Sequence, residues 1–429
     1  MSQAHSTPST LADWLEHIEG VHPKSIELGL DRVLEVRKRL GLTFAGTIIT
    51  VGGTNGKGST CAMLEAILLA AGYQVGLYTS PHLLAYNERV RVNGSPAGDA
   101  QLCEAFARVE AARDGVSLTY FEFGTLAAWV IFAELPLDAL VLEVGLGGRL
   151  DAVNVFDADC AVITSVAIDH TDYLGETRES IGAEKAGIFR AGRPAVVGDP
   201  DPPASLIEHA RAIGADLQCL GRDFGYVAEP AQWMFWSRRA RRAALPHPAL
   251  RGACQLRNAS TCLAALDALA ERLPVGMNEV RRGLTTVAWP ARCQVLPGRP
   301  AIVLDVAHNP EAAAALAQSL GGMGGYARTH AVFGMLRDKD IAGVCRALKG
   351  QISAWYPATL GGARGADAET LARAIRSADA GAQIVSFDSP RSAFAAACRR
   401  AGENDRIVVF GSFYTVADVM AARASGPGS

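Results

Sequence analysis

Residues 47–60 read TIITVGGTNGKGST, and this stretch decides the fold class of the chain. The apolar, β-branched run over 47–51 predicts a buried strand, and the residues from Lys57 through Ala71 predict an apolar helix. The glycines between them let the backbone wrap closely around a phosphate group. Backbone N–H groups at a helix N-terminus add positive potential at the same place. The stretch therefore predicts a phosphate-binding loop.

The side chains of this loop favour a nucleotide. Lys57 is placed to reach terminal phosphates, and Ser59 or Thr60 offers a hydroxyl to Mg²⁺. The spacing departs from the common G-x-x-x-x-G-K-[ST] pattern, because Gly58 follows the lysine and moves the hydroxyl by one position. A turn that only joins a strand to a helix is the alternative. A lysine and two hydroxyls in register favour the nucleotide site.

Apolar strands and helical stretches alternate along the rest of the chain. In the N-terminal part, strands are expected at 74–78, 139–144 and 160–164, with helices near 99–112, 122–134 and 177–187. The alternation restarts near residue 300, with strands at 301–305, 330–333, 352–355, 383–386 and 406–410. Short, continuous apolar strands separated by helices predict mainly parallel, doubly wound sheets. We therefore expect an α/β protein with a large domain over 1–290, a linker rich in proline, glycine and arginine over 291–299, and a smaller domain over 300–429.

Composition narrows the classes of function. The net charge of -3 over 429 residues gives no electrostatic support for general nucleic-acid binding. Nine cysteines without a C-x-x-C pair favour reduced thiols over a disulfide framework or a zinc site. The first fifty residues are interspersed with acidic side chains and lack an apolar run long enough for a signal peptide or a membrane span. We expect a cytoplasmic protein that binds neither nucleic acid nor membrane.

The stretch from 217 to 250 is less clear, because aromatic residues precede a group of arginines there. These residues are Trp233, Phe235, Trp236, Arg238, Arg239, Arg241 and Arg242. Such a pattern is compatible with nucleic-acid contact, but we favour a solvated hairpin or loop.

An acidic residue and a histidine follow two of the expected strands. Glu143 comes at the carboxyl end of the 139–144 strand, the edge at which open α/β sheets bind ligands, and His170 follows the 160–164 strand. Together they predict a divalent-cation site. A helix-capping or solvated Glu143 and a purely structural His170 are the alternatives. Lys185 ends an expected helix, and by itself indicates only an interaction with the helix dipole.

Five motifs, taken together, resemble the folylpolyglutamate synthases, and more closely the bifunctional dihydrofolate synthase/folylpolyglutamate synthases of the Mur-ligase type. They are GTNGKGS at 53–59, SPHL at 80–83, ERVRV at 88–92, the segment 142–154 and DVAHNP at 305–310. The resemblance runs in order from about residue 14 to 420 and is poor over 217–250. It implies an N-terminal P-loop ATPase-like domain of the Mur-ligase central type, which binds ATP and a pterin, and a C-terminal Rossmann-like glutamate-ligase domain.

The resemblance also implies the ligand sets. One Mg²⁺ is expected near Ser59, Ser80 and Glu143, and a second at Glu143, His170 and a carbamylated Lys185. A carbamate supplies an anionic oxygen where an ammonium group would repel the metal. The residues expected to contact ATP are Thr54, Asn55, Gly56, Lys57, Gly58, Ser59, Thr60, Asn258, Arg292 and Asp305. Those expected to bind the pterin substrate are Ser25, Ile26, Glu27, Phe121, Glu122, Phe123, Gly124, Leu150, Asp151 and Ala152.

The implied reaction joins L-glutamate to dihydropteroate, and to folylpolyglutamates, through an acyl phosphate. Lys57 is expected to offset charge during catalysis, and His308 or Asp305 to orient or deprotonate the amine, although a positional role is the alternative for both. A monomer is expected. At 290–293 the chain reads PARC where the family commonly has Pro-Gly-Arg-Phe, so Arg292 is kept. The alternative functions are a monofunctional folylpolyglutamate synthase, another Mur-type amino-acid ligase, or a nucleotide-dependent regulatory protein.

Overall fold

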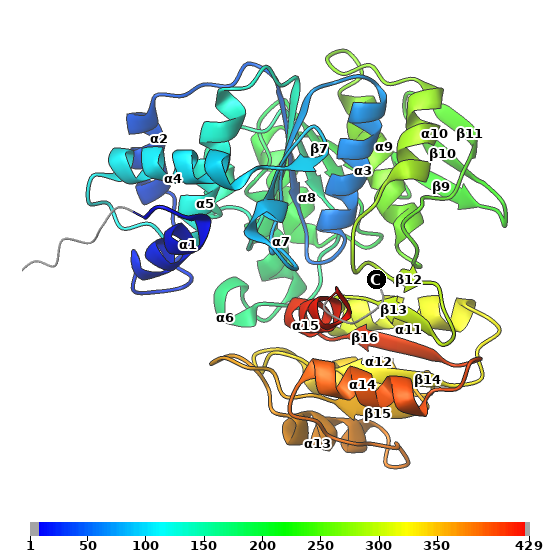
Figure 1. Ribbon diagram of the computed structural model, residues 1–429. Helices are drawn as coiled ribbons and strands as arrows, with labels where there is room; N and C mark the ends of the chain where they lie inside the picture. The colour runs from blue at the N-terminus through cyan, green and yellow to red at the C-terminus, as the bar shows by residue number, and fades with distance from the viewer. Residues whose placement is uncertain (1–7, 425–429) are drawn as a thin grey trace, which may run out of the picture. The chain divides into compact units, whose positions relative to one another are not determined.

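The structure is a computed structural model that describes residues 8–424 (Figure 1). The described chain forms two compact units. Unit 1 comprises 8–166, 177–247 and 258–286, and unit 2 comprises 167–176, 248–257 and 287–424. Two short segments from the first two-thirds of the chain thus belong to the C-terminal unit. No helix described between residues 8 and 424 combines the length and hydropathy needed to cross a bilayer.

Unit 1 is built on an eight-stranded sheet in the order β4-β3-β2-β5-β1-β6-β7-β8. The six strands from β2 to β8 in this order pair in parallel, and β3 and β4 extend the sheet antiparallel at one edge. The strands are β1 (Thr47–Gly52), β2 (Val75–Tyr78), β3 (Val90–Val92), β4 (Ser95–Pro96), β5 (Ala139–Glu143), β6 (Cys160–Ile163), β7 (Pro194–Val197) and β8 (Asp216–Cys219). Strands β1, β2, β5 and β6 are buried along their whole length, as expected for parallel strands covered on both faces.

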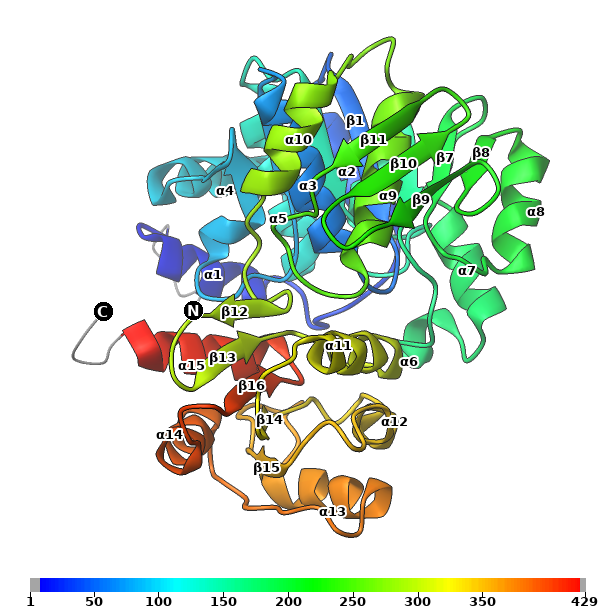
Figure 2. The same cartoon turned by 90° about the vertical axis from the view of Figure 1, so that its right-hand side faces the viewer.

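Helices cover this sheet. They are α1 (Leu11–Gly20), α2 (Asp31–Leu40), α3 (Lys57–Ala70), η1 (Tyr86–Arg89), α4 (Asp99–Arg113), α5 (Tyr120–Ala133), η2 (Ala152–Val155), α7 (Arg178–Ala186), α8 (Ala204–Ile213), α9 (Gln255–Ala268) and α10 (Met277–Thr286). Residues Glu122–Phe132 of α5 are buried without interruption, so this helix lies inside the unit. Helices α3 and α10 lie side by side (Figures 1 and 2), and a Cβ on Gly283 would come within 2.6 Å of the Ile67 backbone.

The stretch expected to be a solvated hairpin or loop is a three-stranded antiparallel sheet, drawn in green in Figure 2: β9 (Phe224–Ala228), β10 (Trp233–Ser237) and β11 (Arg241–Leu245). The expectation of solvation was wrong for Trp233 and Phe235, whereas Trp236 is half-buried. Trp233 and Phe235 alternate along β10 and are fully buried on one face. Of the arginines, Arg238 pairs with Asp223 at 2.7 Å and Arg242 pairs with Asp267 at 2.6 Å.

Unit 2 contains a five-stranded sheet in the order β12-β13-β16-β14-β15, parallel except for β12. Its strands are β12 (Gln294–Leu296), β13 (Ala301–Leu304), β14 (Thr329–Phe333), β15 (Ala354–Pro357) and β16 (Arg406–Phe410). Its helices are α6 (Thr171–Leu174), α11 (Pro310–Gly322), α12 (Ile341–Ala347), α13 (Ala368–Ala378), α14 (Pro390–Arg400) and α15 (Phe413–Ala424). Phe333, Trp355 and Phe410 pack against one another in its core.

The prediction of an α/β protein with a mainly parallel N-terminal sheet and a smaller C-terminal sheet is confirmed. One expected strand was wrong, because residues 383–386 make only isolated bridges beside β15. The side chains of that segment are exposed or half-buried, so packing does not stabilise a strand there. Within the proline- and glycine-rich stretch near 291–299, Gln294–Leu296 forms the edge strand β12.

Candidate active site

The predicted phosphate loop occupies the four residues between β1 and α3. Gly53 and Gly56 have φ angles of 139° and 88°, which favour glycine. A Cβ on Gly56 would lie 2.7 Å from Oδ1 of Asn258, a buried residue of α9. The structure therefore brings Asn258, one of the expected ATP contacts, directly against the loop.

Two hydroxyl residues that were not predicted from the sequence hold the phosphate loop in place through hydrogen bonds. Thr164 and Ser165 follow the end of β6. The Thr54 N–H donates to the Ser165 carbonyl at 2.8 Å, and the Asn55 N–H donates to Ser165 Oγ at 3.1 Å. The Thr164 hydroxyl donates to the Asn55 carbonyl at 2.6 Å. Their position at the carboxyl end of a parallel strand next to β1 is a signal that points to them but does not distinguish them from other hydroxyl residues after strands.

The donors of the loop fit a triphosphate. Lys57 Nζ lies over the loop and donates to the carbonyls of Gly53 and Thr54 at 3.1 and 3.3 Å. Ser59 and Thr60 are buried in the first turn of α3, and Thr60 Oγ1 has no hydrogen-bond partner. An ammonium group over a glycine-rich backbone at a helix N-terminus, with two hydroxyl residues in the first helical turn, matches the donor set that a polyphosphate and its cation require.

Replacing Gly56 with alanine should weaken nucleotide binding about tenfold and destabilise the fold by about 1–2 kcal/mol, because a Cβ meets Asn258 and the positive φ is strained. Gly72 is a matched control: its φ is 90°, but nothing lies within 4 Å of a Cβ there. Gly72→Ala should show the backbone cost alone. Titration with ADP and thermal unfolding of both variants measure the two effects; equal ADP affinities would contradict the steric account.

Glu143 and Ser80 lie together at the carboxyl edge of the sheet. Glu143 ends β5, beside Val51 of β1, and is 4% exposed. The Ser80 N–H donates to Glu143 Oε2 at 3.1 Å. A carboxylate and a hydroxyl residue form an oxygen-rich set that suits Mg²⁺. Among residues 8–424, no three His, Cys, Asp or Glu side chains are arranged to hold a metal, so the expected set, which includes a serine and a modified lysine, stays a prediction.

The three residues expected to share the second metal belong to different units. Glu143 and Lys185 lie in unit 1, and His170 lies in unit 2. Lys185, in the last turn of α7, is only 4% exposed, so its burial exceeds what an interaction with the helix dipole alone would need. A Cβ on Gly148 would lie 2.9 Å from the Lys185 carbonyl, so the glycine-rich loop after β5 packs on this turn.

Within unit 2, His170 belongs to a polar cluster centred on Asp169. Lys339 Nζ lies 2.6 Å from Asp169 Oδ1 and 3.2 Å from His170 Nε2. Asn309 Nδ2 donates to Asp169 Oδ2 at 3.1 Å, and His308 Nε2 lies 3.5 Å from the same oxygen. Burial opposes ionisation, but the hydrogen bond from His308 and the charge of Lys339 outweigh it and hold the pKa of Asp169 well below its usual range.

His170 and His308 were predicted from the sequence as site residues, but Asp169 and Lys339 were not. Because Lys339 contacts Asp169 across 170 positions in the sequence, no local pattern connects them. The remaining signal is the Asp338-Lys339-Asp340 run shortly after β14, at the carboxyl edge of the second sheet.

Asp305 and Arg292 lie near each other in unit 2. Asp305 is half-buried and accepts hydrogen bonds from the backbone N–H groups of Cys293 and Ala307, both at 2.7 Å. Burial raises the pKa of Asp305, although these N–H groups and Arg292 oppose the shift. The Arg292 guanidinium lies 5.2 Å from the centre of the Phe413 ring. Ala291 has a φ of 57°, a conformation that favours the glycine common at this position in the resembling family.

The residues expected to bind the pterin gather in unit 1. Phe121 is half-buried, and a Cβ on Gly145 would lie 2.7 Å from its ring. Asp151 accepts from the N–H groups of Leu146 and Val153 at 2.8 and 3.0 Å. Phe121 and Asp151 thus both contact the loop at 145–146. The sequence neighbours of Asp151, Leu150 and Ala152, are half-buried and buried, respectively.

The other expected pterin contacts differ in accessibility. Phe123 is fully buried and packs against Phe106, and a Cβ on the buried Gly124 would lie 2.3 Å from the Tyr86 hydroxyl. Ser25 is exposed and Ile26 half-buried in the loop before α2. Glu27, in the same loop, and Glu122, in the first turn of α5, bind a common arginine, Arg32.

Asp151 should make stability depend on pH. Complete burial raises the pKa of Asp151 from 3.8 to about 6, so between these pH values the folded state binds the proton more tightly than the unfolded state. Stability attributable to this group is therefore highest below about pH 4 and falls by up to about 3 kcal/mol as the pH rises past about 6. When urea unfolding is measured at pH 4 and pH 7, the free energy of unfolding of Asp151→Asn should lack this part of the pH dependence. A pH dependence equal to that of the wild-type chain would contradict the assignment to Asp151.

Two domain families match the chain: "Mur ligase middle domain" over residues 51–217 and "Mur ligase, glutamate ligase domain" over 291–413. The chain is 47% identical, over 97% of both chains, to the dihydrofolate synthase/folylpolyglutamate synthase of Escherichia coli K12. It belongs to the dihydrofolate synthase/folylpolyglutamate synthase family.

Solved structures of this family match the fold of the chain, and those named below contain adenine nucleotides. A structure of Escherichia coli FolC in complex with DHPP and ADP superposes with a TM-score of 0.93 at 46% identity, covering 99% of each chain. A dihydrofolate synthase/folylpolyglutamate synthase from Yersinia pestis, complexed with AMPPNP and a Mn ion, gives a TM-score of 0.90 at 46% identity and covers 98% of this chain and 100% of its own. The prediction that a member of this family uses ATP and a divalent cation is confirmed.

Proposed function

We propose that this chain is an ATP-dependent ligase that joins L-glutamate to dihydropteroate, forming dihydrofolate, and also extends folylpolyglutamates. The observation that carries the proposal is the loop between β1 and α3, where the Lys57 ammonium group and Asn258 lie against a glycine-rich backbone. The bifunctional relative from Escherichia coli shares 47% of its residues with the chain over nearly its full length.

The chemistry requires activation of a carboxylate. A carboxylate does not condense with an amine at neutral pH, because oxide is its leaving group. Bound ATP, with its Mg²⁺ near Ser59, Ser80 and Glu143, supplies the phosphoryl group that converts the carboxylate to an acyl phosphate, with ADP released. The amine of glutamate then displaces phosphate and forms the amide.

Three residues of the chain are assigned roles in the two steps: Lys57 in the phosphoryl transfer, and His308 and Asp305 in the attack by the amine. Two anions repel each other in the first step, and the Lys57 ammonium offsets part of that charge close to the loop carbonyls that it binds. His308 is assigned to the amine step. Its Nδ1 donates to the Val306 carbonyl at 2.8 Å, and its Nε2 lies 3.5 Å from the Asp169 carboxylate, so the ring is held between two acceptors and is placed to orient the amine. Asp305, held by two backbone N–H groups, orients the 305–308 turn.

Product analysis tests the proposal. The purified chain is incubated with ATP, Mg²⁺ and L-glutamate, and with either dihydropteroate or a reduced folate, and products are identified by mass spectrometry. Both acceptors should gain glutamate. Addition to the reduced folate alone indicates a monofunctional folylpolyglutamate synthase. Addition to a nucleotide-linked cell-wall precursor instead, or ATP binding without turnover on any acceptor, would refute the assignment.

A further inference from the structure

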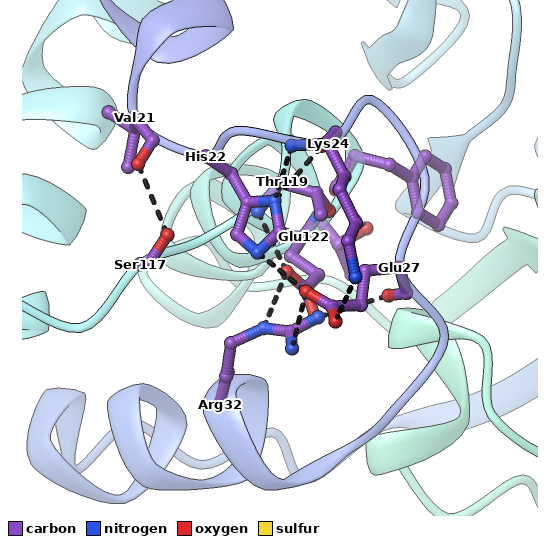
Figure 3. A network of polar contacts seen from close by, with 10 residues as sticks. Val21, His22, Lys24, Glu27, Arg32, Ser117, Thr119 and Glu122 are labelled. Atoms are coloured by element: carbon purple, nitrogen blue, oxygen red, sulfur yellow. Dashed lines mark hydrogen bonds and ion pairs between the residues drawn. The ribbon is translucent and has the colours of Figure 1, made fainter.

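The loop before α2 is tied to the N-terminus of α5 by one guanidinium group, shown in Figure 3. Arg32, in the first turn of α2, donates to Glu122 Oε1 at 2.8 Å through Nη2 and to Oε2 at 3.3 Å through Nε. Nη2 also donates to the Glu27 carbonyl at 3.0 Å, and Nη1 lies 3.4 Å from the Glu27 carboxylate. Arg32 thereby joins segments 90 positions apart in the sequence.

Both ends of this link are fixed by further contacts. Glu122 is 3% exposed, and its carboxylate accepts from the Thr119 N–H at 2.7 Å in a capping box that starts α5. On the other side, His22 and Lys24 lie 2.8 and 3.0 Å from the Glu27 carboxylate (Figure 3). The guanidinium therefore joins a buried helix end to a loop in which residues 23–25 are exposed and the rest are half-buried.

The position of this joint points to a role in substrate recognition. Glu27 and Glu122 are both among the residues expected to bind the pterin, and Phe121 is adjacent to Glu122 in the same helical turn. A loop without regular structure has no backbone ladder to hold its shape, so side-chain links determine where it lies. Arg32 itself is absent from the expected contacts.

We propose that Arg32 is a positioning residue for the pterin-bearing substrate, because it ties the 25–27 loop to the first turn of α5, next to Phe121. This inference rests on the proposed function, because it specifies a determinant of the same site. It depends on the two-sided geometry of the guanidinium and not only on its charge, since lysine has a single nitrogen and cannot bind the Glu27 carbonyl and both Glu122 oxygens in the same way.

Steady-state kinetics of three variants test the proposal. Arg32→Met removes the joint, and Arg32→Lys keeps the charge opposite the buried Glu122, so that the fold is retained. Arg39→Met is the matched control: Arg39 lies on the same helix, binds Glu35 at 3.0 Å, and ties α2 to the Arg113 carbonyl at 2.7 Å, but it touches no expected substrate contact. The KM for dihydropteroate, ATP and L-glutamate and the kcat are measured for each, together with urea unfolding and calorimetric binding of dihydropteroate.

Both Arg32 variants should raise the dihydropteroate KM and its dissociation constant by about tenfold, the loss expected for a positioned, charge-assisted hydrogen bond, with the KM for ATP and L-glutamate unchanged. Arg39→Met should alter only stability. A folded Arg32→Lys with wild-type dihydropteroate binding would overturn the proposal, as would a parallel rise in all three KM values. Failure of the proposed function is distinguishable, because then the wild-type chain itself would not ligate glutamate to dihydropteroate.

Discussion

Lys57→Ala should lower the rate of ATP-dependent ligation by about 10³-fold, the loss seen when a group that stabilises developing charge is removed. Lys57 Nζ lies over the phosphate loop, bonded to the carbonyls of Gly53 and Thr54. Among the expected ATP contacts only Arg292 also carries a positive charge, and it lies in unit 2, outside the loop. Initial rates of ADP release with both acceptor and glutamate present measure the effect.

The same substitution should leave the fold intact, because Lys57 is at the first position of α3 and contributes no apolar side chain to the core. Lys349→Ala, which removes an exposed lysine in unit 2, serves as the control for loss of one positive charge. The circular dichroism spectra and the unfolding temperatures of Lys57→Ala and Lys349→Ala should differ no more than expected for a substitution at the surface. Near-normal ligation by Lys57→Ala would exclude the assigned phosphate site.

Lys185→Ala should have the second-largest effect, a loss of about 10²-fold or more in activity, because the resemblance assigns its carbamate to a metal. Short carboxylates such as acetate should restore part of that activity by entering the space left by the side chain and supplying an anionic oxygen. The ligation rate measured against added acetate gives the expected saturation curve. The Mg²⁺ concentration needed for half-maximal activity should rise in the variant and fall again with acetate.

Lys38→Ala is the matched control for Lys185. Lys38 also lies in the last turn of a helix, α2, but is exposed. If Lys185 served only the helix dipole, both substitutions would change stability slightly and neither would respond to carboxylates. An unmodified lysine at position 185 in a high-resolution map of the active protein would contradict the carbamate assignment.

The parts of the fold that local chemistry dictates could be predicted from the sequence. The strand, glycine turn and helix at 47–70 were predictable because the turn needs positive φ at Gly53 and Gly56, and because the strand is apolar along its whole length. The error at 383–386 has a different cause: only Ile384 of this segment packs against the core, Val385 is exposed, and the backbone beside β15 forms only isolated bridges.

The polar part of the site was less predictable because its contacts join distant residues. Arg32 meets Glu122 across 90 positions, and Lys339 meets Asp169 across 170. No periodicity or motif encodes such pairs. Thr164 and Ser165 were missed for a different reason: hydroxyl residues after a strand are common, and only the observed hydrogen bonds with the loop over 54–55 distinguish these two.

Calorimetric titration of ADP in the presence of Mg²⁺ tests the central claim most directly, since everything proposed depends on nucleotide binding by the loop over 53–60. The wild-type chain and Lys349→Ala should bind one ADP saturably with equal affinity, and Lys57→Ala should bind it at least about tenfold more weakly. A folded wild-type chain with no affinity for ADP, or undiminished affinity in Lys57→Ala, would contradict the account.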